Sequence, residues 1–188
     1  DHPLLKEVGM IHSIRHWHGN PHAIWVGAET QEAIYCLNKR GNDIRPKRKI
    51  ELKDMKKGSG IAHLMFEDSK YNRWIVAVNA LIIQYAGDDG FVPVDYDLGT
   101  VSGIAEDEHG YVWIGSNKGL YRIRLPEKKG ITLPEITRID NKWQIYSENI
   151  TAIGVDKAGD LWIGTQEGYI FRHCTQTGIY TDMSAEIH

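Results

Sequence analysis

Two stretches of the sequence decide the fold: Ile104-Ala-Glu-Asp-Glu-His-Gly-Tyr-Val-Trp-Ile-Gly-Ser116 and Ile153-Gly-Val-Asp-Lys-Ala-Gly-Asp-Leu-Trp-Ile-Gly-Thr165. In each stretch an apolar run leads into an Asp-x-x-Gly turn and then into a second apolar run that carries a tryptophan. An aspartate can bond its own backbone two residues on, and glycine accepts a positive φ, so both residues suit a tight hairpin. We therefore expect Asp107 and Asp156 to hold turns rather than to bind calcium or act as general acids.

The same pattern begins four times along the chain. The four starts are Ile11-His-Ser-Ile14, Ile61-Ala-His-Leu64, Val101-Ser-Gly-Ile104 and Ile150-Thr-Ala-Ile153, followed by Trp25, Trp74, Trp113 and Trp162. The first and last starts are 139 residues apart, so the mean period is about 46 residues, which is typical of a propeller or another repeat array. Within each period the turn signals divide the chain into four short strands.

The sequence therefore predicts an all-β chain of four four-stranded antiparallel β-propeller blades. We place the blades at residues 11–52, 61–97, 101–146 and 150–183 of one partial propeller domain, residues 1–188. The fourth strands of the last two blades are expected at Lys142–Tyr146 and Ile179–Thr181. The second blade departs from the pattern, because Val76 replaces a glycine and its turn, Ser69–Asn72, contains no glycine.

The Asp-x-x-Gly turns and the Trp-Ile-Gly strands of the third and fourth blades resemble the two-component regulator propeller repeat. This resemblance implies a periplasmic sensor domain of a bacterial hybrid two-component system, notably one that responds to glycans. It also implies rings of about seven blades. Since four blades fall short of that number, we expect either self-association or further blades of a longer chain. The repeat motif is structural and brings no catalytic residue to this sequence.

Composition excludes several classes of protein. A net charge of −3 argues against a dedicated nucleic-acid binder, and no run of 18 apolar residues is present to span a membrane. Cys36 and Cys174 lack the spacing of a metal or redox site. Because the chain starts at Asp1 rather than at a methionine, we expect a processed or partial piece of a longer protein.

Two clusters of charged or titratable residues invite a functional interpretation. Five of the nine histidines are His2, His12, His16, His18 and His22, but they lack the fixed spacing and nearby acidic ligands of a metal site. Solvated loop histidines are favoured, and no metal or cofactor is expected. The segment Lys39–Lys57 holds nine of the 22 basic residues. An outer strand kept soluble by its charges is favoured over a patch for an acidic ligand.

Ligand contacts are expected where the turns between second and third strands meet the links between blades. The candidate residues there are polar and rich in amides: Glu29, Gln31, Asn79, Asn117, Lys118, Gln166, Glu167 and Asn149. Such side chains suit hydrogen bonds to an oligosaccharide or to a protein. No Ser-His-Asp, paired-carboxylate or phosphate-loop pattern is present.

The sequence thus favours a non-catalytic, periplasmic or extracellular ligand-sensing module. A propeller enzyme of the streptogramin-lyase type and a structural protein-interaction scaffold remain alternatives, since one fold serves many functions.

Overall fold

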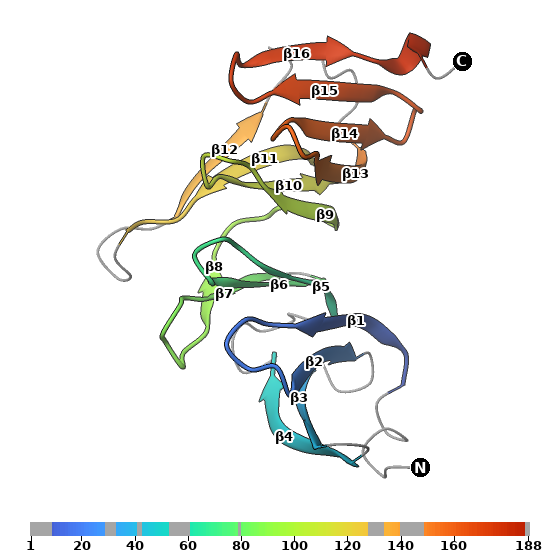
Figure 1. Ribbon diagram of the computed structural model, residues 1–188. Helices are drawn as coiled ribbons and strands as arrows, with labels where there is room; N and C mark the ends of the chain where they lie inside the picture. The colour runs from blue at the N-terminus through green and yellow to red at the C-terminus, as the bar shows by residue number, and fades with distance from the viewer. Residues whose placement is uncertain are drawn as a thin grey trace. The chain divides into compact units, whose positions relative to one another are not determined.

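The computed structural model describes residues 9–28, 33–40, 43–52, 61–78, 80–127, 134–139 and 149–186, and only the backbone of residues 43–48. Its strands form four separate sheets, each with four antiparallel strands in chain order (Figure 1). The prediction of an all-β chain made of four-stranded propeller blades is therefore confirmed. Among the described residues, no helix is long and apolar enough to cross a membrane.

The chain divides into two compact units, residues 1–97 and residues 98–188. The first unit contains blade 1 and blade 2. Blade 1 consists of β1 (Ile11–His16), β2 (Ala23–Ala28), β3 (Ala33–Arg40) and β4 (Asp43–Glu51). Blade 2 consists of β5 (Ala62–Glu67), β6 (Arg73–Ala77), β7 (Ala80–Gln84) and β8 (Val92–Val94).

The second unit contains blade 3 and blade 4. Blade 3 consists of β9 (Val101–Glu106), β10 (Val112–Ser116), β11 (Gly119–Arg124) and β12 (Glu135–Ile139). Blade 4 consists of β13 (Ile150–Val155), β14 (Leu161–Thr165), β15 (Ile170–Cys174) and β16 (Ile179–Asp182), and a 3-10 helix follows at Ser184–Glu186.

The position predicted for the outer strand of blade 3 was wrong. That strand is β12, in which Ile139 pairs with Leu120 and Ile136 with Ile123. Residues 142–146, where the strand was expected, lie outside the described residues. Lys142–Ile145 alternates polar and apolar side chains, whereas Ile136 and Ile139 of β12 are three positions apart, so periodicity favoured the wrong segment.

One aspartate per blade fixes the first turn in blades 2, 3 and 4. In blade 3, Asp107 Oδ1 accepts hydrogen bonds from the backbone N–H groups of His109 and Tyr111, at 2.9 and 3.0 Å. Its Oδ2 accepts the indole N–H of Trp113 at 2.7 Å. Asp68 and Asp156 bond their turns in the same way and accept the indoles of Trp74 and Trp162. The expected turn-holding role of Asp107 and Asp156 is confirmed.

The same turn differs in blades 1 and 2. Trp17 takes the place of the aspartate in blade 1 and stacks on Trp25, with ring centroids 4.5 Å apart. Within the described residues, the buried indole N–H of Trp17 has no hydrogen-bond partner. In blade 2, Tyr71 adopts a φ of 66° where Gly110 and Gly159 have 75° and 86°. A side chain in this left-handed region costs about 1 kcal/mol.

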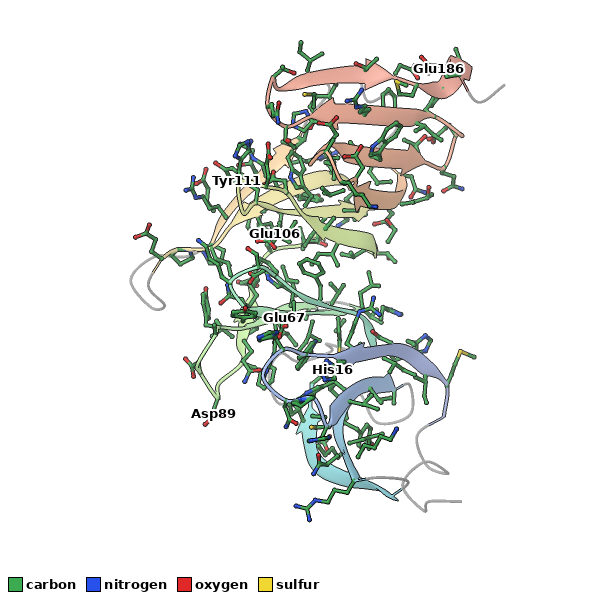
Figure 2. The ribbon with its side chains drawn as sticks, viewed as in Figure 1. His16, Glu67, Asp89, Glu106, Tyr111 and Glu186 are labelled. Atoms are coloured by element: carbon green, nitrogen blue, oxygen red, sulfur yellow. The ribbon has the colours of Figure 1, made fainter. Side chains whose placement is uncertain are left out.

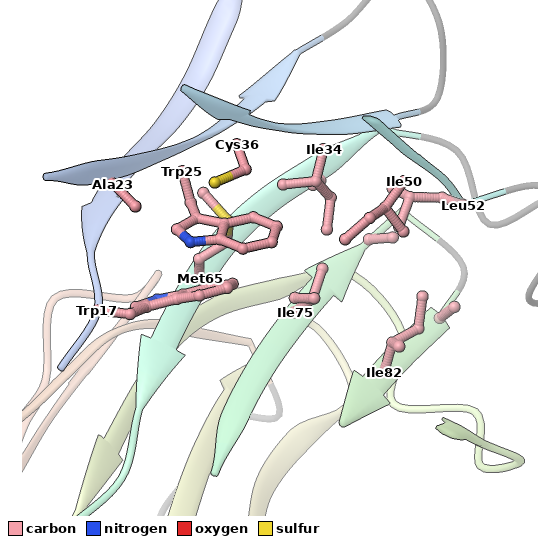
Figure 3. Close-up of a cluster of buried hydrophobic side chains, with 13 residues drawn as sticks. Trp17, Ala23, Trp25, Ile34, Cys36, Ile50, Leu52, Met65, Ile75 and Ile82 are labelled. Atoms are coloured by element: carbon pink, nitrogen blue, oxygen red, sulfur yellow. The ribbon is translucent and has the colours of Figure 1, made fainter. Parts of the chain in front are cut away.

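Blades 1 and 2 pack face to face over one apolar cluster (Figure 3). Trp17 and Trp25 lie on the side of blade 1, and Met65 and Ile75 lie on the side of blade 2. Two hydrogen bonds also join these blades. Arg15 Nε donates to Met65 O at 3.0 Å, and the backbone N–H of His18 donates to Glu67 Oε1 at 2.8 Å (Figure 2 labels Glu67).

Blades 3 and 4 interlock through glycines. A Cβ added at Gly115 would lie 2.6 Å from Ile150 Cγ2, and one at Gly103 would lie 2.9 Å from Ile153 Cγ1. Ser102 Oγ also lies 2.5 Å from the carbonyl oxygen of Ile150 and 3.1 Å from that of Gly115. The small residues of blade 3 therefore admit the first strand of the next blade.

Replacing Asp107 with alanine is expected to lower the free energy of unfolding by about 3 kcal/mol, because it leaves the buried Trp113 indole N–H without an acceptor. Chemical denaturation followed by tryptophan fluorescence measures the change. Asp156→Ala is the matched control and should cost clearly less, because Asp156 is exposed. Equal losses in the two variants would contradict this account.

The substitution Gly115→Ala should destabilise the second unit by about 1–3 kcal/mol, since its Cβ overlaps Ile150. Gly164, at the same place in blade 4, has no atom closer than 3.6 Å to an added Cβ. Its alanine variant should stay within about 0.5 kcal/mol of the wild type. Thermal melting of both variants tests the difference, and a Gly115→Ala variant as stable as the wild type would rule out the close contact.

Candidate functional site

In the second unit, the turn after each tryptophan strand is tied to the residue that precedes the blade. The backbone N–H of Asn117 donates to Thr100 O at 3.0 Å, and the backbone N–H of Thr100 donates to Asn117 Oδ1 at 2.8 Å. In blade 4 the backbone N–H of Gln166 donates to Asn149 O at 3.0 Å, and Asn149 Nδ2 donates to Gln166 Oε1. Each turn is thereby fixed at the start of its own blade.

The two tied turns lie at the same edge of the second unit. Ser102 Oγ contacts the carbonyl oxygen of Ile150, which places the starts of β9 and β13 side by side. Gly99 has a φ of +71° and leaves no room for a Cβ beside the side chains of Asn117 and Lys118. We call the polar residues gathered there the turn edge: Thr100, Asn117, Lys118, Asn149, Gln166 and Glu167.

Five of the eight predicted ligand residues belong to the turn edge. Asn117, Lys118, Gln166 and Glu167 are exposed, and Asn149 is half-buried. Glu29, Gln31 and Asn79 lie outside the described residues. In blade 2 a backbone bond of 3.1 Å from Val78 N to Ile61 O repeats the tie between turn and blade start. That these residues bind a ligand stays a prediction.

The sequence interpretation missed Tyr169 at this edge. In blade 3 the turn is short, because Ser116 pairs directly with Gly119. In blade 4 the turn contains one residue more, since the backbone N–H of Thr165 donates to Tyr169 O and Ile170 pairs with Gly164. Tyr169 therefore lies opposite Thr165, in the place that Gly119 takes opposite Ser116, and its side chain is 38% exposed. Aligning the two glycine turns, Asn117-Lys-Gly and Gln166-Glu-Gly, reveals this insertion.

Two of the described histidines near the N-terminus, His12 and His18, have different neighbours. His12 contacts His63 edge to face, with ring centroids 5.5 Å apart, whereas His18 stacks on Tyr71 at 4.5 Å. Burial lowers the pKa of His63, and the charge of His12 lowers it further. Among the described residues, no group of three or more His, Cys, Asp or Glu side chains is placed to hold a metal ion. His2 lies outside the described residues.

The basic segment contributes the end of β3 and the whole of β4, which is the outer strand of blade 1. This location agrees with the prediction of a charged outer strand. Lys49 Nζ lies 2.5 Å from Glu51 Oε1, and it lies 6.0 Å from the ring centroid of Tyr35.

A second cluster of rings lies at the blade 3–blade 4 interface. His173 is 5% exposed and stacks on Tyr180, with ring centroids 4.0 Å apart, and it forms an edge-type contact with Trp113 at 5.5 Å. Burial lowers the pKa of His173 and raises the pKa of the Tyr180 hydroxyl. The guanidinium groups of Arg122 and Arg124 lie 4.6 and 5.2 Å from the ring centroid of Tyr111, which Figure 2 labels. In blade 4 the Asp156 carboxyl has a lowered pKa, chiefly because it accepts the Trp162 indole N–H.

Sequence comparison identifies a family over part of the second half of the chain. Residues 96–118 and 147–167 match the model of the two component regulator propeller family. These two segments contain the turn edge and both Asp–Trp bonds of the second unit. A search of curated proteins finds no match to the sequence.

Solved structures share the propeller fold. The extracellular domain of a protein described as the hybrid two component system BT3049 from B. thetaiotaomicron is 16% identical, with a TM-score of 0.70 over 92% of this chain. The corresponding domain of BT4673 from the same organism is 14% identical, with a TM-score of 0.68 over 94% of this chain. This chain spans 22% of each of those domains.

Virginiamycin B lyase from Staphylococcus aureus is a third match. It is 14% identical, with a TM-score of 0.52 over 94% of this chain and 70% of the lyase. At such identities the three likenesses establish the fold alone.

Protonation of His173 should destabilise the second unit in mild acid. Its pKa in the folded state lies below 6.5, the ordinary value of a histidine. At pH values between the folded-state pKa and 6.5, the unfolded chain therefore binds more protons than the folded chain. The stabilisation is complete above a pH of about 6.5 and is lost as the pH falls through the folded-state pKa. Denaturation at several pH values between about 5 and 8 measures this slope.

The variant His173→Phe keeps a ring on Tyr180 but cannot titrate, so its stability should depend less on pH. His63→Asn serves as the control in the first unit and should leave the His173 contribution in place. A His173→Phe protein with the full wild-type slope would contradict the assignment.

Proposed function

We propose that this chain belongs to the extracytoplasmic sensing region of a bacterial two-component-type regulator and binds a ligand without transforming it. The observation that carries this proposal is the match of residues 96–118 and 147–167 to the two component regulator propeller family. The extracellular location of the two B. thetaiotaomicron domains supports placing this chain in the periplasm or outside the cell.

The chemistry of the turn edge favours a neutral, hydroxyl-rich ligand. Asn117, Asn149 and Gln166 carry amides, which offer both donors and acceptors of hydrogen bonds. Lys118 and Glu167 carry opposite charges, so the edge has no net charge to select an anion or a cation. An oligosaccharide fits this combination better than a phosphorylated or strongly charged ligand.

Tyr169 supplies the apolar surface that such a ligand also requires. A tyrosine ring presents an apolar face together with a polar hydroxyl, which suits contact with a sugar ring. The ring lies at the same turn as Gln166 and Glu167 and is 38% exposed. We therefore assign recognition of an oligosaccharide to the turn edge and Tyr169. A protein partner is the alternative occupant of the same edge.

Removal of the Tyr169 ring should weaken oligosaccharide binding about tenfold, which corresponds to about 1.4 kcal/mol. The probes are a panel of neutral oligosaccharides, screened on an array and then titrated by calorimetry against wild type and Tyr169→Ala. Tyr96→Ala is the matched control, because Tyr96 is 39% exposed and lies in the other unit. This control should bind as the wild type does.

Three results would overturn the assignment. The first is that no oligosaccharide of the panel binds the wild type. The second is that Tyr96→Ala loses as much affinity as Tyr169→Ala. The third is cleavage of the bound saccharide, detected by product analysis. The last result would favour the lyase or hydrolase alternative.

A further inference from the structure

The outward face of blade 4 repeats the face through which blade 3 holds its neighbour. In blade 3, Gly115 pairs with Gly103 and Trp113 pairs with Ala105. In blade 4, Gly164 pairs with Ala152 and Trp162 pairs with Gly154. Both faces therefore carry one tryptophan and three small residues in the same register. We call these four residues of blade 4 the open socket: Ala152, Gly154, Trp162 and Gly164.

The two filled interfaces show what such a face accepts. Blade 3 receives Ile150 and Ile153, the two apolar residues three positions apart at the start of blade 4, against Gly115 and Gly103. Blade 1 receives the start of blade 2 in the same way, because a Cβ at Gly27 would lie 2.7 Å from the carbonyl oxygen of Ala62. In both units the occupant is the first strand of a blade.

No strand within the described residues fills the open socket in this way. Ala152 and Gly154 are exposed and Trp162 is half-buried, whereas Trp113 in the filled face of blade 3 is 1% exposed. A Cβ at Gly154 would meet no atom within 4 Å. Beside Trp162, Arg172 pairs across the strands and donates to Asp160 Oδ2. The open socket is thus an apolar surface with a charged pair at its margin, as in a protein interface.

Blade 1 presents the strand that the open socket would accept. Ile11 and Ile14 take the places of Ile150 and Ile153, with the same bulge between the paired residues. Ile14 pairs with Val26 as Ile153 pairs with Ile163. Ile11 and Ile14 are 43% and 55% exposed, whereas Ile150 is 1% exposed. The chain therefore carries both halves of a blade–blade contact, each exposed.

We propose that two copies of this chain associate head to tail, with Ile11 and Ile14 of one copy in the open socket of the other. The contact joins different surfaces of the two copies, so each complex keeps one free isoleucine pair and one free socket. Association therefore continues beyond a dimer as the concentration rises, until the chain of copies closes. This proposal rests on the packing of blades and is independent of any ligand at the turn edge.

Sedimentation velocity over a concentration series tests the contact with two variants that disable opposite halves. Ile11→Ser with Ile14→Ser removes the two exposed side chains, and Gly164→Val fills the open socket. Each should weaken self-association about tenfold or more. Val78→Ser is the matched control, because Val78 is an exposed aliphatic residue in a turn, at 38% exposure. Circular dichroism and thermal melting verify that every variant remains folded.

Mixing the two disabled proteins gives the decisive result. The double serine variant still has a socket and the Gly164→Val variant still has its isoleucines, so an equimolar mixture should form a one-to-one complex and stop there. A wild-type chain that stays monomeric at every concentration would overturn the proposal. So would a dimer that both variants leave intact, or a mixture that fails to restore association.

Discussion

A single carboxylate in each of blades 2, 3 and 4 organises the turn, the adjacent strand and the large ring that fills the blade. Asp107 bonds two backbone N–H groups of its turn with one oxygen and the Trp113 indole with the other. The bond to the indole sets the ring against the sheet, where it meets the first strand of blade 4. The hairpin geometry and the contact between blades therefore depend on the same side chain. Blade 1 lacks this carboxylate and uses the stack of Trp17 on Trp25 instead.

The repeat made most of the fold predictable. Isoleucine pairs, Asp-x-x-Gly turns and tryptophan strands are local patterns, and each reports directly on the strand or turn that contains it. The outer strand of blade 3 was misplaced because an outer strand lacks such a pattern. Glu135–Ile139 does not alternate apolar and polar side chains as Lys142–Ile145 does, and only its pairing with β11, such as that of Ile139 with Leu120, identifies it as the outer strand.

The candidate site was predictable in its residue types but not in its bonding. Topology placed Asn117, Lys118, Gln166, Glu167 and Asn149 at one end of their blades, and the structure brings them together there. Asn117 and Gln166 form hydrogen bonds with the residues that precede their own blades. These bonds involve backbone groups, which every residue carries, so the sequence pattern does not predict them. Tyr169 was missed because its exposure results from one inserted residue, and an insertion is visible only when two turns are compared position by position.

The tie between Asn117 and Thr100 has a mechanical consequence. Thr100 belongs to the segment that leads into blade 3, and its backbone N–H and C=O are both engaged by Asn117. A molecule bound to the Asn117 turn would therefore also restrain the segment through which the chain enters blade 3. The hydrogen bonds between Asn149 and Gln166 tie the segment that leads into blade 4 to its turn in the same way. Binding at this edge would reduce the flexibility of the segments that lead into blades 3 and 4. A loss of flexibility can couple distant sites without any change in the structure of a blade.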